Sequence, residues 1–236
     1  MSATRYTPHE LDALRRFKVP TLANAIETFG VIPPNTGYCD SSMRCHYPEL
    51  PLMLGYAVTA HIGSGEPRKG ILEADYWRFV AAQPGPKVAV VQDIDPPRGA
   101  IWGEWNANVH RALGCVGMVT EGAARDLDSV HPLGFHFFST HVLPVHAYAA
   151  FLDFGDPVEV AGLTVHTGDL LAGDMHGIIL SPNEVPLPDL AKVAAEIDRL
   201  EGRIFALCQS PDFTLERLVE LDAETAARWP GSPSAG

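Results

Sequence analysis

An arginine and an aspartate that are neighbours in the chain, Arg125 and Asp126, are the residues whose position best suits chemistry. They follow the apolar segment 115–120 and Gly122, so they stand just beyond an expected buried strand and its turn. Ligands of layered α/β proteins gather at such strand ends, where this pair would offer a guanidinium group beside a carboxylate. The simpler interpretation is an ordinary strand, turn and helix, with Asp126 as a local cap and Arg125 as a surface charge.

Covalent chemistry at a lysine is the first alternative to chemistry at Arg125 and Asp126. Schiff-base chemistry requires a lysine whose pKa is lowered in an apolar environment. The sequence has four lysines, and none is expected inside an apolar strand: Lys18, Lys69, Lys87 and Lys192. This pattern favours a metal ion over an imine.

Ten histidines raise the question of a zinc site. No HxxxH pair on a clear helix and no CxxC pair accompanies them, and a spacing of five residues places alternate members on opposite faces of a strand. We expect structural or solvent-exposed roles for His131, His136, His141 and His146. His176 is the histidine that we expect to contact a substrate or to support a residue that does.

A longer pattern surrounds Arg125 and Asp126. Residues 117–126 read Gly-x-Val-x-Glu-Gly-x-x-Arg-Asp. This pattern resembles the signature of the family named for the regulator of ribonuclease activity A (RraA), which also holds the 4-hydroxy-4-methyl-2-oxoglutarate aldolases. Further similar segments follow in order over roughly residues 20–205: 21–26, 55–59, 102–104, 168–170 and 174–182. The sequence departs from the family pattern at Asn24, at Glu121, in the insertion 39–47 and in the histidine-rich stretch around His141 and His146.

The resemblance implies a fold and an assembly. The fold is an α/β architecture, an αββα sandwich of the swivelling β/β/α type, and we expect residues 1–236 to form one such domain. The assembly is a homotrimer or a homohexamer made of two trimers, with active sites between subunits.

The resemblance also implies a divalent metal, Mg2+ (or Mn2+), held directly by Asp126 and otherwise by water. Mg2+ keeps several waters and commonly needs only one or two carboxylates, so a single aspartate is sufficient. Arg125 would face the carboxylate or C2 oxygen of a 2-oxo acid. Peptide N–H groups at a helix start would bind the substrate carboxylate, and these belong to Gly103, Glu104, Trp105 and Asn106.

A base is needed for the hydroxyl proton of an aldol substrate. In the family it is a water held by acidic side chains, one of them from the C-terminal helix of a neighbouring subunit. Glu201 aligns with that position and Glu196 does so less well, although a solvated helix face explains either residue. Glu104 and His176 are alternative bases.

These expectations combine into a function. The chain is predicted to be a metal-dependent (class II) pyruvate aldolase, a lyase that cleaves a 4-hydroxy-2-oxo acid to pyruvate by a retro-aldol reaction. Decarboxylation of oxaloacetate passes through the same enolate and is expected alongside it. Two alternatives stay open: a non-catalytic regulatory protein that resembles a ribonuclease inhibitor, and a metal-dependent hydratase or isomerase of another oxo acid.

The elements that must position these residues alternate along the chain. Two helices are expected within about 7–30, followed by an irregular excursion over about 31–54. The remaining expected elements are strands at 55–62, 88–91, 115–120, 135–139, 170–174 and 177–182, a hairpin at 157–165, helices at 70–82, 102–113, 126–130 and 187–207, and a frayed tail at about 229–236.

Composition narrows the partners. Seventeen basic against 29 acidic residues give a formal net charge of -12, and the longest basic cluster is 15–18, so no nucleic-acid partner is expected. Four widely spaced cysteines form no zinc pattern or disulfide framework. No apolar run approaches the roughly 20 residues that span a bilayer. We therefore expect a reduced, cytoplasmic protein with no membrane partner and a small 2-oxo acid as its substrate.

Overall fold

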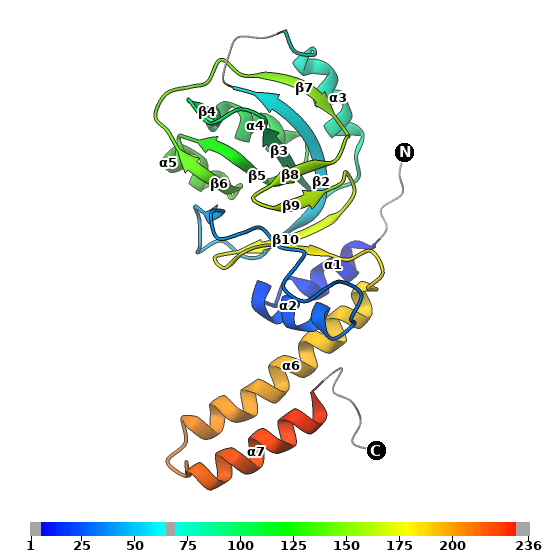
Figure 1. The fold of residues 1–236 in the computed structure, drawn as a ribbon, viewed down its shortest axis with the longest axis vertical. Helices are drawn as coiled ribbons and strands as arrows, with labels where there is room; N and C mark the ends of the chain where they lie inside the picture. The colour runs from blue at the N-terminus through cyan, green and yellow to red at the C-terminus, as the bar shows by residue number, and fades with distance from the viewer. Residues whose placement is uncertain (1–5, 65–68, 230–236) are drawn as a thin grey trace.

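The computed structural model describes residues 6–64 and 69–229, and Figure 1 shows a curled sheet with helices packed against it. Its strands are β1 (Arg44–Cys45), β2 (Met53–Gly63), β3 (Lys87–Asp93), β4 (Ala100–Trp102), β5 (Cys115–Ala124), β6 (His136–Val142), β7 (Ala150–Phe154), β8 (Val158–Val160), β9 (Leu163–Val165), β10 (Leu170–Asp174) and β11 (Gly177–Ser181). Its helices are α1 (Pro8–Leu14), α2 (Val19–Glu27), α3 (Glu73–Ala82), α4 (Glu104–Ala112), α5 (Leu127–Val130), the 3-10 helix η1 (His131–Leu133), α6 (Leu187–Cys208) and α7 (Leu215–Arg228).

The main sheet is mixed and curls around β2. Within the described residues its order is β1-β6-β5-β3-β2-β10-β11, with β4 paired to β5 and β7 paired to β2. β2 is 11 residues long. It pairs with β10 up to Tyr56 and with β7 from Ala60 onward, while β3 runs parallel along it. β2 therefore has a different antiparallel neighbour along each half.

Three apolar clusters hold the body together. One lies under α1, α2 and the first half of α6, and a second lies under α3, α4 and α5. The third fills the inside of the curl, where the β8–β9 hairpin covers β2, β3 and β5. That hairpin turns through Ala161 and Gly162, both at positive φ, which suits the twist of a two-residue connection. The predicted hairpin is confirmed, and β3, buried along almost its whole length, confirms the apolar strand at 88–91.

Two local predictions are wrong. Gly122 lies inside β5, where a Cβ atom would come within 2.8 Å of the Ile101 side chain, so a close approach and not a turn selects this glycine. Lys87 begins β3 and is buried, although no lysine was expected in such a position. Burial lowers its pKa, and its Nζ donates to the carbonyl oxygens of Val80 and Leu113 at the ends of two helices. A buried ammonium group with backbone acceptors anchors helices and is not free to form an imine.

Five elements were not predicted: β1, β4, η1, β7 and α7. The last pairs with the second half of α6 to form a two-helix arm that projects from the body (Figure 1). An ion pair between Arg203 and Glu224, at 2.9 Å, joins the two helices. Over the described ranges no helix is long and apolar enough to span a membrane. Of the predicted tail at 229–236, all but Trp229 lies outside the described residues.

Candidate active site

A cavity of about 440 Å³ lies at the carboxyl ends of β4 and β5. These two strands are parallel, so the segments that follow them, Gly103 and then Arg125 with Asp126, meet at one edge of the sheet. The described residues that line the cavity are Ile62, Gly70, Ile71, Glu73, Ala100, Ile101, Trp102, Gly103, Trp105, Asn106, Arg125, Asp126, His146, Ala147, Ala149, Ala150 and Phe151. Five predicted site residues are therefore brought together at one cavity.

Asp126 is held in an unusual backbone conformation, with φ 57° and ψ 37°. Aspartate is one of the few non-glycine residues that adopt this left-handed region readily. Its Oδ2 atom accepts a hydrogen bond from the backbone nitrogen of Glu104 at 3.1 Å and lies 3.5 Å from Nε of Arg125. Its side chain makes no capping hydrogen bond to α5. The carboxylate therefore links two strand ends and does not serve as the cap of the following helix.

Gly103 is required by this contact. A Cβ atom there would lie 2.5 Å from Oδ2 of Asp126 and 3.1 Å from Cγ of Arg125. Gly103 also precedes α4, so its small size lets the first turn of that helix reach the carboxylate. The backbone N–H of Glu104 donates to Asp126. The backbone N–H groups of Trp105 and Asn106 therefore remain as first-turn donors that have no acceptor within the helix.

Two of these predicted side chains differ in how freely they can meet a ligand. The Asn106 amide nitrogen donates to the carbonyl oxygen of Ile101 at 3.1 Å, so that side chain is fixed against β4. Trp105 is 73% exposed and presents an indole ring at the rim of the cavity. Arg125 and Asp126 are intermediate, with side chains 37% and 38% exposed.

The residues present fit a hydrated Mg2+ better than a metal caged by protein. Among the described residues no group of three or more His, Cys, Asp and Glu side chains is arranged to hold a metal ion. Asp126, by contrast, is a partly exposed carboxylate on a cavity wall with room for water. Mg2+ prefers oxygen ligands and retains most of its waters, so Asp126 would be its direct ligand.

Sequence reasoning missed one acidic residue of this cavity, Glu73. It stands in the first turn of α3, and partial burial raises the pKa of its carboxyl group. The same wall contains Gly70 and Ile71, which are fixed to β7: the Ile71 nitrogen donates to the carbonyl oxygen of Phe151 at 2.9 Å. The sequence did not predict this wall, because β7 was not predicted. The pairing of β7 with β2 places the wall beside the cavity.

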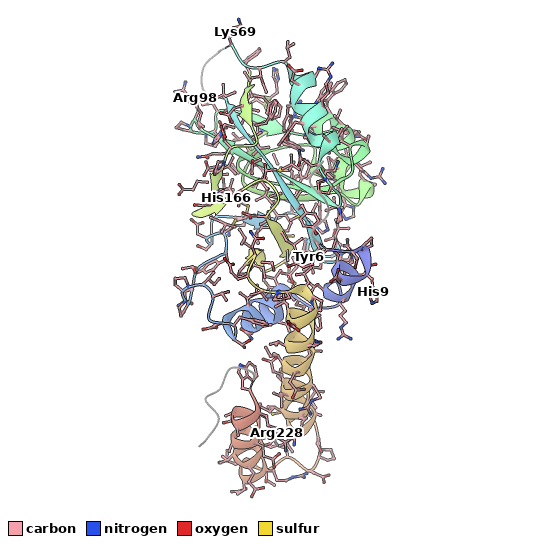
Figure 2. The ribbon with its side chains drawn as sticks, turned by 90° about the vertical axis from the view of Figure 1, so that its right-hand side faces the viewer. Tyr6, His9, Lys69, Arg98, His166 and Arg228 are labelled. Carbon is pink, nitrogen blue, oxygen red and sulfur yellow. The ribbon has the colours of Figure 1, made fainter. Side chains whose placement is uncertain are left out.

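Glu201 does not join this cavity within one chain. It lines a separate hollow on the arm together with Phe205, Asp222 and Trp229. Figure 2 shows Lys69, which precedes the cavity wall, at the opposite end of the molecule from Arg228 on α7. Glu201 can reach Asp126 only if it comes from another copy of the chain.

Two of the histidines, His146 and His176, lie in different parts of the structure. His146 lines the cavity and packs against Tyr148, with ring centroids 4.9 Å apart. His176 lies in the β10–β11 turn, where its Nδ1 is 3.0 Å from Asp174. Asp174 in turn accepts a hydrogen bond from the Val19 nitrogen at the start of α2. His176 therefore makes a structural contact and is not among the residues that line the cavity of its own chain.

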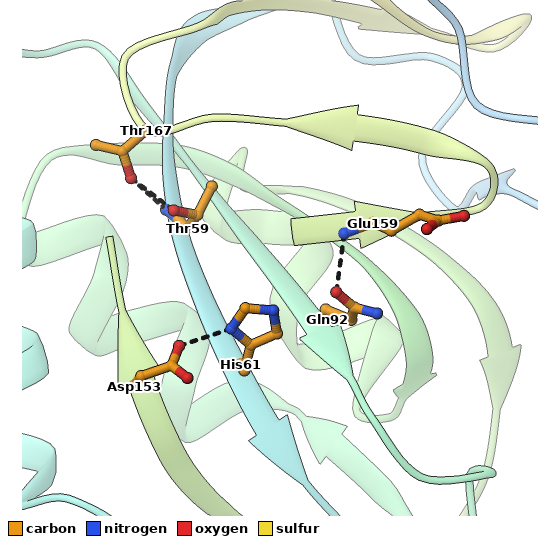
Figure 3. A network of polar contacts seen from close by, with 6 residues as sticks. All are labelled: Thr59, His61, Gln92, Asp153, Glu159 and Thr167. Carbon is orange, nitrogen blue, oxygen red and sulfur yellow. Dashed lines mark hydrogen bonds and ion pairs between the residues drawn. The ribbon is translucent and has the colours of Figure 1, made fainter. Parts of the chain in front are cut away.

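The glutamate of the Gly-x-Val-x-Glu-Gly pattern, Glu121, is absent from the cavity lining and contacts the β8–β9 hairpin. Burial raises its pKa, while hydrogen bonds with the Ala161 backbone and the Gln92 side chain oppose that rise. Figure 3 shows the surrounding network, in which Gln92 accepts from the Glu159 nitrogen at 2.8 Å and His61 meets Asp153 at 2.6 Å. Glu121 thus fastens the hairpin to the sheet.

The sequence of this chain is similar to those of curated proteins. A protein of Halalkalibacterium halodurans provisionally named 4-hydroxy-4-methyl-2-oxoglutarate aldolase is 28% identical over 131 residues, covering 55% of this chain and 60% of its own length. A protein of Marinomonas sp. with the same provisional name is 31% identical over 104 residues, covering 43% and 64%. The chain thus matches less than two thirds of the length of either relative.

Solved structures share the fold. RraAS2 of Streptomyces coelicolor, described as an unusual member of the RNase ES inhibitor RraA protein family, matches with a TM-score of 0.67 at 21% identity over 84% of this chain and 96% of that one. The RNA-processing inhibitor RraA of Thermus thermophilis matches at 0.53 and 18% identity over 68% and 94%. The predicted αββα sandwich is confirmed. A family model described as Aldolase/RraA matches residues 19–180, and the chain belongs to this RraA-like family.

Proposed function

We propose that this protein is a divalent-metal-dependent lyase that releases pyruvate from a 4-hydroxy-2-oxo acid and decarboxylates oxaloacetate. The observation that supports it most strongly is the contact of Asp126 with the Glu104 amide beside Arg125, on the wall of one cavity. A protein that acted only through its surface would have no physical need for this arrangement. The names of the aldolase relatives agree with it.

In this proposal different residues of the chain bind the substrate and the metal ion. Arg125 binds the carboxylate or the C2 oxygen of the 2-oxo acid, because a planar guanidinium group meets two oxygens at once. The first-turn amides of Trp105 and Asn106 add donors at the positive end of α4. Asp126 holds Mg2+ (or Mn2+), which when bound supplies positive charge that stabilises the developing enolate.

The base comes from a second copy in this proposal. Glu201, acting through a water, takes the C4 hydroxyl proton. Large exposed apolar side chains occur both near the cavity, at Leu72 and Tyr148, and on the arm, at Phe205 and Val219. Apolar surface of this kind marks places where chains associate. A homotrimer or homohexamer would cover it and bring the two parts of the site together.

Pyruvate release tests the function. Oxaloacetate and a panel of 4-hydroxy-2-oxo acids are incubated with the full chain, with Mg2+ and with excess chelator. We expect pyruvate only when the metal is present. Turnover that survives the chelator would contradict metal dependence, and a complete lack of turnover would favour the non-catalytic regulatory alternative.

A further inference from the structure

Asp126 lies in a short stretch of backbone that other parts of the chain hold in place. Its φ of 57° is in the left-handed region, which residues other than glycine keep only where their surroundings fix the backbone. The helix that follows, α5, has four residues, too few to be stable without contacts to the rest of the protein. Contacts from outside this turn therefore determine where the Asp126 carboxylate points.

The chain before Asp126 is held by neighbouring strands. The Arg125 nitrogen donates to the carbonyl oxygen of Trp102 at 2.9 Å. The Leu143 nitrogen donates to the carbonyl oxygen of Ala124 at 3.1 Å. After Asp126 the chain leaves the sheet and enters α5, so a different contact is needed on that side of the turn.

The side chain that supplies this contact is Tyr47. Its hydroxyl group donates to the carbonyl oxygen of Leu127, the residue after Asp126, at 2.7 Å. The tyrosine is buried, 4% exposed, and its ring lies edge-on to the His131 ring with centroids 5.2 Å apart and packs on Phe137. Tyr47 thus contacts the first residue of α5 and the residue just after its end.

Tyr47 belongs to a segment, residues 44–50, that is fastened to the edge of the main sheet. The first two residues of the segment form β1, which pairs with β6. The His46 nitrogen then donates to the carbonyl oxygen of Phe137 at 3.0 Å, and Nε2 of His46 lies 2.7 Å from the hydroxyl oxygen of fully buried Ser139. The hydroxyl group of Tyr47 is therefore presented to α5 from a fixed support.

The same segment makes a second contact that is exposed. Glu49 forms a hydrogen bond with the His131 ring, and both side chains are about half exposed to solvent. An exposed pair of this kind contributes little by itself, so the buried hydroxyl of Tyr47 is the stronger contact. The insertion 39–47, where the sequence departs from the family pattern, ends at this tyrosine.

We propose that Tyr47 is a positioning residue for the metal-binding carboxylate, because its hydroxyl group holds the Leu127 carbonyl oxygen, and with it the Asp126 turn, against the 44–50 segment. The proposal rests on the function proposed above, in which Asp126 is the direct ligand of Mg2+. Tyr47 is not among the described residues that line the cavity. It acts through the backbone of the residues that follow β5.

Tyr47→Phe tests the proposal, because it removes the hydroxyl group and retains the buried ring. The Leu127 carbonyl oxygen keeps a second donor, the His131 nitrogen, so the variant is expected to fold. Two quantities are measured on the full chain: amide hydrogen exchange in peptides that cover 126–133, by mass spectrometry, and the dissociation constant of Mn2+, from the electron paramagnetic resonance signal of the free ion. We expect the exchange rate and the dissociation constant each to rise by about 2- to 13-fold, the change that corresponds to one neutral hydrogen bond.

Tyr6→Phe is the matched control. The Tyr6 hydroxyl also donates to a backbone carbonyl oxygen, that of Val185 at 3.3 Å, but it packs on the cluster under α1, α2 and α6. This variant should change neither the exchange over 126–133 nor the affinity for Mn2+. Glu49→Gln alters the exposed contact of the 44–50 segment and should change both quantities less than Tyr47→Phe does.

Each outcome decides a different part of the proposal. Unchanged exchange in Tyr47→Phe overturns the contact with the turn, and faster exchange with unchanged Mn2+ affinity overturns the positioning role. An equal loss of affinity in Tyr6→Phe also overturns that role, because the effect would then come from lower overall stability, and a larger effect of Glu49→Gln would assign it to the exposed pair. Absence of Mn2+ binding to the natural sequence would defeat the proposed function together with the positioning role, whereas Mn2+ binding without pyruvate release would defeat the function alone.

Discussion

The Oδ2 atom of Asp126 accepts a hydrogen bond from the backbone nitrogen of Glu104 at 3.1 Å. This contact joins the end of β5 to the start of α4, two points 22 residues apart in the chain. It aligns the carboxylate, Arg125 and the first helical turn on one cavity wall. The activity proposed for the protein depends on this alignment.

Gly103→Ala tests the alignment without removing any functional group. The new methyl group would lie 2.5 Å from Oδ2 of Asp126, so the carboxylate must move. A displacement of about 1 Å can cost about 100-fold in rate, and we expect a loss of that order in pyruvate release. Gly85→Ala is the control, since its Cβ atom would meet nothing nearer than 3.9 Å. Equal activity in both variants would show that the Asp126 position is not critical.

Arg125→Lys separates charge from geometry. Lysine keeps the positive charge but cannot form two parallel hydrogen bonds to a carboxylate. Loss of one charge-assisted hydrogen bond, worth about 1.5–3 kcal/mol, corresponds to a fall in kcat/KM of about 10- to 160-fold. Arg111→Lys, at the last turn of α4 and outside the cavity lining, is the matched control. Normal kinetics in Arg125→Lys would show that Arg125 is a surface charge and does not bind the substrate.

Two buried histidines predict how stability depends on pH. Burial lowers the pKa of His110 and of His136 from 6.5 to about 4 in each case. In the unfolded chain both groups bind protons below about pH 6.5, whereas the folded protein keeps them neutral. Between pH 6.5 and 4 the unfolded state therefore binds more protons, and the free energy of unfolding falls as the pH is lowered. For His110, nearly fully buried against Trp102, the loss reaches about 3 kcal/mol.

Urea unfolding at pH 7.5 and pH 5 measures the part of this loss that falls above pH 5, about 2 kcal/mol for His110. His110→Gln is expected to flatten the difference between the two pH values, although it also lowers stability at pH 7.5 by disturbing the hydrogen bond to the Asn106 carbonyl oxygen. His9→Gln changes an exposed histidine and should leave the difference as it is. A difference that His110→Gln does not reduce would rule His110 out as its source.

Much of the fold and part of the site could be predicted from the sequence, for physical reasons that differ by residue. Apolar runs such as 88–91 and the pattern at 117–126 carry local signals, so β3 and the Arg125–Asp126 pair were found. Glu73 was missed because it reaches the cavity through the pairing of β7 with β2, a contact between distant segments. The structural contact of His176 with Asp174, which in turn accepts from the Val19 nitrogen at the start of α2, is also a contact that no local spacing reveals.

The base is tested by comparing two reactions. Retro-aldol cleavage requires removal of a hydroxyl proton, while decarboxylation of oxaloacetate does not. Glu201→Gln should therefore lower kcat for cleavage by about 100-fold or more and affect decarboxylation much less. Glu216→Gln, on α7 and outside the Glu201 hollow, is the control. Equal losses in the two reactions would show that Glu201 is a structural residue, and Glu104 would then be the alternative base.

The role of Asp126 is the central claim, and Asp126→Asn tests it most directly when measured beside Asp128→Asn. The amide retains the size of the side chain but loses the negative charge that a hydrated Mg2+ requires, whereas Asp128 is an exposed neighbour two residues along. The measurement is Mg2+-dependent pyruvate release from oxaloacetate and from a 4-hydroxy-2-oxo acid, with unfolding followed in parallel. We predict that Asp126→Asn abolishes both reactions while the protein stays folded, and that Asp128→Asn retains both. Undiminished Mg2+-dependent turnover in Asp126→Asn would contradict the account.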